Sequence, residues 1–254
     1  MRHSAFKLFL FMWIVACGGP GTVSAADDAE AAIEQANALY MESRYADAIA
    51  MYETLIAEGF DNGYLHYNLG NAYFREGHLG RAILHYLKAQ QRLPRDEKIE
   101  ANLLFALQQT EDRMSWHVPG FLTTVFFWLK DVTLREHLWA LLAVNLVLWM
   151  TQAFRVVRRT AGTQLARNIA LGVLGLVLIS TVARVAYDSG HRYAVVLAEN
   201  VAVYAEKGSE QPILFRLHEG AAGVITKEES GWYHIILPDD SAGWVRIQDN
   251  QIGT

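Results

Sequence analysis

The sequence predicts a multidomain membrane protein with three parts: an α-helical solenoid of repeats, a two-helix transmembrane hairpin and a small all-β barrel. Three observations predict this. The first third of the chain repeats with a period of about 34 residues, which is typical of stacked helix pairs. Two long apolar runs follow, and after them apolar and polar residues alternate with a period of two. Only 19% of the 254 residues are charged, fewer than in most soluble proteins.

Composition argues against several classes of function. The net charge of −5 at pH 7 disfavours a nucleic-acid binder, which usually presents a basic face. The single cysteine, Cys17, supports neither a disulfide framework nor a thiolate metal site, and the nine histidines show no zinc-binding spacing. The sequence contains no phosphate-binding loop and no nucleophile motif. We therefore expect no catalytic residues, no metal and no cofactor.

The N-terminus is typical of an export signal, predicted over residues 1–25. Its positive charges are Arg2, His3 and Lys7. The apolar run 8–16 that follows is too short to span a bilayer. Val23-Ser24-Ala25 then provides a small-x-small cleavage pattern, so the mature chain would begin at Ala26. In the alternative interpretation, a lipoprotein box ends at Cys17 and this cysteine is lipidated. Both interpretations export the domain that follows. A retained signal anchor is the third interpretation.

The repeat domain is predicted over residues 26–113. Small and large residues alternate in a set that resembles a tetratricopeptide repeat: Gly70, Tyr73, Gly77, Leu79, Ala82, Tyr86, Ala89 and Pro94. In that repeat two antiparallel helices cross closely, which requires small residues at Gly70 and Ala82. The pattern recurs one period earlier, between Ala36 and Leu55. We predict two repeats, 29–61 and 63–95, and a capping helix over 96–112; a generic helical bundle is the alternative.

Such a solenoid presents a concave surface lined by the first helix of each repeat. The candidate peptide-binding groove contains four asparagines and three aromatic residues: Asn37, Asn68, Asn71, Asn102, Tyr64, Tyr67 and Phe74. The asparagines form two pairs of equal spacing, Asn37 with Asn68 and Asn71 with Asn102. An amide offers both a donor and an acceptor, which matches a peptide backbone without selecting a sequence. The alternative is that these asparagines bridge the repeats internally.

Two apolar runs predict transmembrane helices over residues 137–156 and 168–187. The connecting loop, 157–167, and its flank carry four arginines and no acid: Arg155, Arg158, Arg159 and Arg167. Short arginine-rich loops remain cytoplasmic. Both globular parts are therefore expected on the periplasmic side of a bacterial inner membrane, in agreement with the export signal.

Asn145, Gly172 and Gly175 are the candidate packing residues of the hairpin. A polar residue in mid-span usually faces a partner, and Ser180, Thr181 or another chain are the expected partners of Asn145. Arg184 is expected to extend to the outer interface. An apolar segment over 116–131 is too short to cross and predicts an interfacial helix on the outer leaflet, or else a docking surface for a neighbouring transmembrane helix.

The C-terminal β domain is predicted over residues 190–254. Six short strands alternate with turn signals: Ala194–Leu197, Val201–Tyr204, Ile213–Leu217, Gly223–Thr226, Trp232–Ile236 and Gly243–Ile247. About 60 residues in short strands suit a small closed barrel. The segments Gly231-Trp232-Tyr233 and Gly243-Trp244-Val245 resemble bacterial SH3-type domains. The resemblance implies binding of peptides or wall polymers, with Trp232, Tyr233 and Trp244 either as contacts or as core.

The order of these parts resembles the BatE family of aerotolerance operons. The stretches Tyr67-Asn68-Leu69-Gly70-Asn71-Ala72-Tyr73 and Asn102-Leu103-Leu104 are similar to repeats of that family. The resemblance implies partners of two kinds, a MoxR-type ATPase and membrane proteins with von Willebrand A domains. It also implies an envelope complex linked to stress or oxygen tolerance.

The sequence therefore leads to a non-enzymatic scaffold at the inner membrane as the first functional hypothesis. The alternative is a peptidoglycan-binding anchor that acts through the SH3-like domain. An enzyme or transporter would need a polar catalytic cluster or a charged path through the membrane, and the sequence contains neither.

Overall fold

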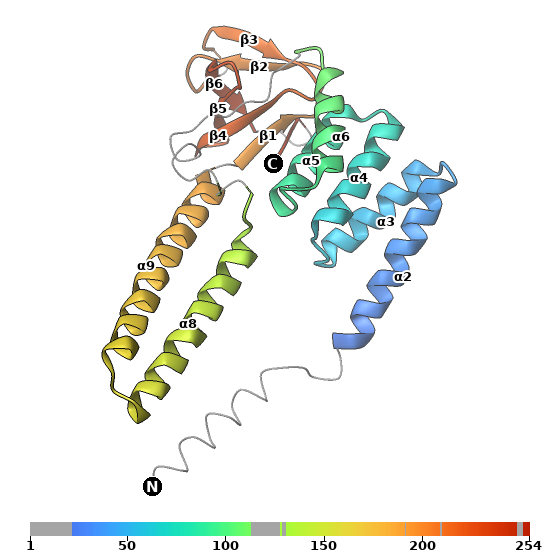
Figure 1. The fold of residues 1–254 in the computed structure, drawn as a ribbon. Helices are drawn as coiled ribbons and strands as arrows, with labels where there is room; N and C mark the ends of the chain where they lie inside the picture. The colour runs from blue at the N-terminus through green and yellow to red at the C-terminus, as the bar shows by residue number, and fades with distance from the viewer. Residues whose placement is uncertain (1–21, 113–127, 129–130, 191, 209, 248–250) are drawn as a thin grey trace. The chain divides into compact units, whose positions relative to one another are not determined.

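A computed structural model describes residues 22–112, 128, 131–190, 192–208, 210–247 and 251–254. Most of the predicted export signal, with Cys17, lies outside the described residues, as does the predicted interfacial segment apart from Trp128 and Asp131. The elements run in chain order from helix α2 to strand β7, and Figure 1 labels all of them except β7. The chain divides into two compact units, and Asp61 is the last residue of the first.

The first unit contains helices α2 (Thr22–Met41) and α3 (Tyr45–Ala57). Its core includes Ala36, Ala48, Tyr52 and Leu55, all of them buried. Ser43 makes the turn between the helices with a left-handed φ of 62°. The equivalent residue of the next repeat is Gly77, which ends helix α4 with a φ of 90°. Both helix pairs thus turn through the same backbone conformation, which glycine adopts without strain and serine does not.

The second unit begins with helices α4 (Gly63–Glu76), α5 (Leu79–Arg92) and α6 (Glu97–Gln108). Two of them start at polar caps. The side chain of Asn62 accepts a hydrogen bond from the backbone N–H of Leu65, and Asp96 accepts from those of Lys98 and Ile99. Each cap satisfies helix donors that would otherwise lack partners.

The close crossing of α4 and α5 depends on Gly70, as the sequence predicted. A Cβ atom at Gly70 would lie 2.7 Å from Cδ1 of the buried Tyr86 and 3.3 Å from the carbonyl oxygen of Ala82. Neither contact is an ordinary van der Waals distance, so any side chain at Gly70 would force the helices apart.

A pair of histidines is packed between α4 and α5. Nδ1 of His66 lies 2.9 Å from Nδ1 of His85, and the rings stack with their centroids 5.2 Å apart. Tyr73 stacks on the other side of His85 at 5.5 Å. Burial, followed by the neighbouring His66, lowers the pKa of His85 to about 3. His85 is therefore neutral where it packs between the repeat helices.

Helices α8 (Leu134–Val157) and α9 (Ala161–Gly190) pack side by side as an antiparallel hairpin. Both are long and apolar enough to span a membrane. The predicted loop 157–167 is wrong in its length, because α9 already begins at Ala161 and Arg167 lies on it. Thr160 and Thr163 cap this start, with the hydroxyl of Thr160 accepting from the backbone N–H of Thr163 at 3.3 Å. Hydropathy does not reveal such a polar first turn.

The C-terminal domain is one antiparallel sheet with the order β3-β2-β6-β5-β4-β1-β7. Its strands are β1 (Arg192–Val196), β2 (Val201–Tyr204), β3 (Ile213–Leu217), β4 (Ala222–Glu229), β5 (Trp232–Ile236), β6 (Ala242–Arg246) and β7 (Ile252–Gly253). Three strands, β2, β3 and β5, have the predicted bounds. Val203 and Val245 are fully buried in its core. Within the described residues, strand pairing leaves β3 and β7 at the edges.

The loop from His218 to Gly220 fixes this sheet to the repeat helices. The carboxylate of Glu219 accepts a hydrogen bond of 2.8 Å from the backbone N–H of Gly80, in the first turn of α5. His218 bonds to Asp112 through its backbone N–H at 2.8 Å and through Nδ1 at 3.0 Å. The side chain of His78 makes no cap for α5, so Glu219 supplies the missing acceptor.

Candidate protein-binding face

Three polar side chains on α4 and α6 form a network with Tyr86 of α5. The hydroxyl of Tyr86 donates to Oδ1 of Asn71 at 2.8 Å. Nδ2 of Asn102 donates to the same oxygen at 2.8 Å and to the hydroxyl oxygen of Tyr67 at 3.1 Å. The network therefore holds the two amides in fixed orientations on neighbouring helices.

This orientation leaves the NH₂ group of one amide and the carbonyl oxygen of the other available on the surface. Oδ1 of Asn71 accepts two hydrogen bonds, whereas its Nδ2 makes none with the described residues. Both N–H groups of Asn102 are used, whereas its Oδ1 has no partner in the described part of the chain. Both residues are partly exposed. A free amide N–H beside a free carbonyl oxygen is complementary to the C=O and N–H of a peptide backbone.

Exposed aromatic rings flank the two amides. The ring of Phe74 on α4 lies 5.7 Å from that of Phe105 on α6. Phe105 is 58% exposed, and Tyr64, at the start of α4, is 62% exposed. We call the surface made by these residues the asparagine face: Tyr64, Tyr67, Asn68, Asn71, Phe74, Asn102 and Phe105. Exposed aromatic residues beside fixed polar groups are typical of protein-binding surfaces.

The sequence did not identify Phe105 as a site residue. The signal was present, because Phe105 follows Asn71 by one period of the repeat. Phe105 therefore occupies on α6 the position that Asn71 occupies on α4. The predicted pairing of Asn71 with Asn102 concealed this register.

Asn37 occupies the position that corresponds to Asn71. Its Oδ1 accepts a hydrogen bond of 2.6 Å from the hydroxyl of Tyr52, which lies 15 residues further along the chain. Tyr86 follows Asn71 by the same 15 residues and makes the same kind of bond. The equivalent asparagines are thus one repeat period apart, and each ties the first helix of its repeat to the second. Asn68 is partly buried and also makes an interaction. Asn37 and Asn71 thus bond within their own repeats, and the bond from Asn102 to Asn71 joins α6 to α4.

A second aromatic surface lies on the β domain. Trp232 and Trp244 are half-buried on the outer face of β5 and β6. The ring of Tyr204 packs edge-on against Trp232 at 5.5 Å, and that of His234 packs against Trp244 at 5.0 Å. The ammonium group of Lys207 lies 5.0 Å from the centroid of Trp244, within range of a cation–π interaction.

Tyr233 does not belong to this surface. It is only 7% exposed and lies in the core with Val203 and Val245, because alternate residues of a strand point to opposite faces. The sequence predicted Tyr233 either as a ligand contact or as a core residue. The structure shows that it is a core residue, so the prediction of a contact is wrong. Gly243 allows β2 to approach, since a Cβ atom there would meet Val203 Cγ1 at 2.5 Å.

The hairpin residues are arranged differently from the expectation. The hydroxyl of Ser180 lies 2.9 Å from Nε2 of His137 and accepts a hydrogen bond of 2.9 Å from Trp128. Thr181 donates to the carbonyl oxygen of Val177 at 2.7 Å. Asn145 is exposed and bonds to neither. Both of its expected partners within the hairpin are therefore bonded elsewhere.

The two glycines depart from the expected packing, and Arg184 is held within α9. A Cβ atom at Gly172 or Gly175 would meet nothing within 4 Å, so neither glycine lies in the contact with α8. The guanidinium of Arg184 is buried, forms a 2.9 Å ion pair with Asp188 and lies over the ring of Tyr187 at 5.6 Å. A carboxylate one helical turn away therefore holds Arg184, and its place at an outer interface stays a prediction.

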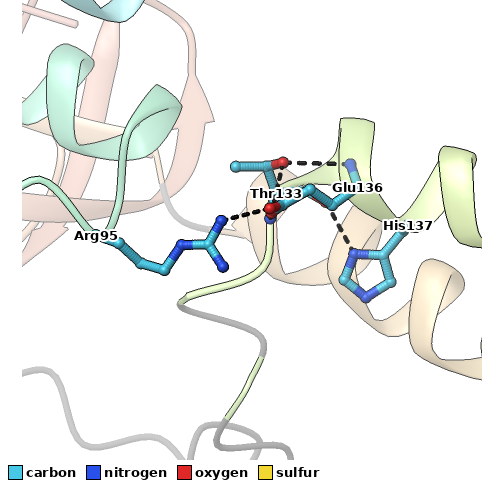
Figure 2. A network of polar contacts seen from close by, with 4 residues as sticks. All are labelled: Arg95, Thr133, Glu136 and His137. Atoms are coloured by element: carbon cyan, nitrogen blue, oxygen red, sulfur yellow. Dashed lines mark hydrogen bonds and ion pairs between the residues drawn. The ribbon is translucent and has the colours of Figure 1, made fainter.

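A polar network joins the repeats to the start of α8. Figure 2 shows the guanidinium of Arg95 bonded to the carboxylate of Glu136. The same carboxylate accepts from the backbone N–H of Thr133 at 2.8 Å, and the Thr133 hydroxyl accepts from the backbone N–H of Glu136 at 3.3 Å. This capping box is visible in the sequence as Thr-x-x-Glu. The hydrogen bond between this capping box and Arg95, 41 residues away along the chain, cannot be seen in the sequence.

Comparison with known protein families identifies one of these parts. Residues 63–96, which include α4 and α5, match the model of the tetratricopeptide repeat. The chain therefore contains a tetratricopeptide repeat, a module that is typically non-catalytic and mediates protein–protein interaction. A search of curated proteins found no match.

Proposed function

We propose that this chain is a non-enzymatic scaffold in a bacterial inner membrane and that its asparagine face holds an extended segment of a partner protein. The observation that carries the proposal is the oriented pair of amides, with Nδ2 of Asn71 and Oδ1 of Asn102 available to one peptide unit. Exposed rings on both sides would bury apolar side chains of the segment. Hydrogen bonds to the peptide backbone would give affinity, and the side-chain contacts would give preference for particular partner sequences.

The proposed setting follows from the order of the parts and their resemblance to the BatE family. The hairpin would anchor the chain in the membrane, with the repeats and the sheet in the periplasm. Membrane proteins with von Willebrand A domains and a MoxR-type ATPase are the partners that we propose, in an envelope complex linked to stress or oxygen tolerance.

We expect Phe105→Ala to weaken capture of the partner about tenfold without changing the stability of the repeats. Phe105 is 58% exposed, so its removal leaves no cavity. The matched control is Leu104→Ala, since Leu104 is 45% exposed but points about 100° away around the same helix. Pull-down from membranes, with quantification of von Willebrand A-domain proteins, measures the effect. Equal recovery with both variants would contradict the proposal.

The second expectation concerns orientation in the membrane. Arg155, Arg158 and Arg159 lie at the turn between α8 and α9, where a basic turn favours the cytoplasm. The hydrogen bond between Gly80 and Glu219 joins the repeats to the sheet, which supports placing both on the same side of the membrane. In chains with Cys17→Ser, we expect an impermeant maleimide to label Glu210→Cys in cells with a permeable outer membrane. Gly162→Cys should react only after lysis, and the reverse pattern would invert the proposed topology.

The alternative function is a peptidoglycan anchor, and one observation favours it. Trp232, Trp244 and Tyr204 form a half-exposed aromatic surface on the sheet, and such surfaces also stack against wall polymers. Sedimentation of the detergent-solubilised chain with purified cell wall distinguishes the two proposals. Binding that Trp232→Ala removes and Phe105→Ala leaves intact would favour the anchor.

A further inference from the structure

Helix α8 carries two lines of residues at the spacing of a coiled coil. The first line faces α9 and is buried or half-buried: His137, Leu141, Val144, Leu148, Thr151 and Arg155. The second line runs alongside it: Leu138, Leu142, Asn145, Trp149 and Gln152. Its steps of four and three residues repeat a heptad, the pattern by which helices pair along a seam. We call this second line the open seam.

The open seam is exposed from Leu138 to Trp149, whereas Gln152 at its end is half-buried and accepts a hydrogen bond from Arg155. Leu138 is 54% exposed, Leu142 is 57% exposed and Trp149 is 69% exposed. Gly172 and Gly175 on α9 do not approach it, and α9 occupies the first line. Large apolar side chains facing lipid need no explanation, but the residue at the centre of the seam is polar.

Asn145 is the feature that lipid cannot satisfy. It is exposed and has no hydrogen-bond partner among the described residues. Ser180 and Thr181, its expected partners on α9, are bonded to other groups, and Ser180 lies beside His137, about two helical turns from Asn145. An amide without partners in hydrocarbon is costly, so the seam needs a partner that offers a donor and an acceptor at this depth.

We propose that a second copy of this chain covers the open seam, with Asn145 of each copy bonded to Asn145 of the other. This inference rests on the proposed membrane hairpin. Two copies inserted in the same orientation are related by a twofold axis along the membrane normal, so each seam position faces its own counterpart. An amide is complementary to itself, because it both donates and accepts.

The rest of the seam suits a copy of itself. Residues 138–152 contain no charged side chain, so bringing two of these helices together creates no repulsion. Leucines lie on one side of Asn145, and Trp149 on the other. An asparagine at a single seam position fixes the register of paired helices, which gives Asn145 a specific role in the dimer.

Cysteine cross-linking of the full chain in membranes tests this pairing. In a Cys17→Ser background, we expect oxidation to link two copies through Leu142→Cys. The matched control is Val147→Cys, because Val147 is 51% exposed but lies on the opposite side of α8. Asn145→Leu should weaken self-association roughly 3- to 30-fold in a bilayer dilution assay, and Asn145→Gln should retain most of it.

Each contrary result has a distinct meaning. Release of the chain from membranes by carbonate would overturn the proposed hairpin and the pairing with it. Retention in membranes without a Leu142→Cys cross-link would overturn the pairing alone, as would a product in which this cysteine joins a protein of different mass. Unchanged self-association of Asn145→Leu would remove the role of the amide.

Discussion

Acidification from pH 7 to pH 5 is expected to lower the free energy of unfolding of the α4–α5 repeat by about 2 kcal/mol. The cause is His85, whose pKa lies near 3 in the folded chain and near its ordinary value of 6.5 when the chain unfolds. Below pH 6.5 the unfolded state binds a proton that the folded state does not. Stability is therefore unaffected above neutrality and falls as the pH drops toward 3.

The structure explains why the folded state resists protonation. The ring of His85 is packed between His66 and Tyr73, and its Nδ1 shares a hydrogen bond with Nδ1 of His66. A charged His85 would face a second imidazole in a site that little solvent reaches. Lys88, Arg81 and Arg92 act in the same direction, although each does so less than burial and His66.

Hydrogen exchange of the α4 and α5 amides in the detergent-solubilised chain measures this loss, once rates are corrected for the intrinsic effect of pH. The His85→Gln variant should lose most of the pH dependence. The His78→Gln variant should keep it, since His78 is exposed. If His85→Gln and the unmodified chain lost equal stability between pH 7 and pH 5, the buried pair would not be the source.

Gly220→Ala is expected to destabilise the junction between the sheet and the repeats by about 1–3 kcal/mol more than Gly231→Ala does. Both glycines have a left-handed backbone, with φ of 87° and 80°, so both substitutions carry the same backbone penalty. A Cβ atom at Gly220 would also lie 2.6 Å from Thr110 Cγ2, whereas one at Gly231 would meet nothing within 4 Å.

Thr110 cannot move aside cheaply, because it is buried and its hydroxyl donates to the carbonyl oxygen of Leu107 at 2.7 Å. We therefore expect Gly220→Ala to displace the loop and break the cap that Glu219 makes on α5. Limited proteolysis at residues 218–220 and hydrogen exchange at the start of α5 report this separation. Equal effects of the two glycine substitutions would show that the contact contributes nothing.

The same junction has the opposite pH dependence to the histidine pair. The hydrogen bond from His218 to the Asp112 carboxylate raises the pKa of His218. This stabilisation is fully present below the ordinary pKa of histidine and is lost as the pH rises through the raised value. The His85 site therefore loses stability as the pH falls below 6.5, whereas the His218 site loses stability as the pH rises.

The position of the junction bears on the proposed scaffold. The sheet is held at the start of α5, whereas the asparagine face lies on α4 and α6. The two candidate surfaces thus belong to different elements and do not share residues. A scaffold that engages two partners requires this separation.

The local patterns predicted much of the fold. The strands β2, β3 and β5 have the bounds expected from period-two alternation, and Gly70 makes the close helix crossing expected from the repeat. Strand β7 was missed because two residues are too few to show a period. The candidate site was predicted less well, since Asn71 was paired with Asn102, whereas its equivalent by hydrogen bonding is Asn37, one repeat period earlier.

What the sequence alone determined is what depends on near neighbours: the helical repeat, the apolar hairpin and the alternating strands. Periodicity reports which side of an element is apolar, and that is a local property. The tertiary structure alone decided which polar groups meet. Glu219 caps a helix 139 residues away, His66 stacks on His85, and Asn102 fixes Asn71. Hydrogen bonds between distant residues depend on exact positions in space, which no spacing along the chain specifies.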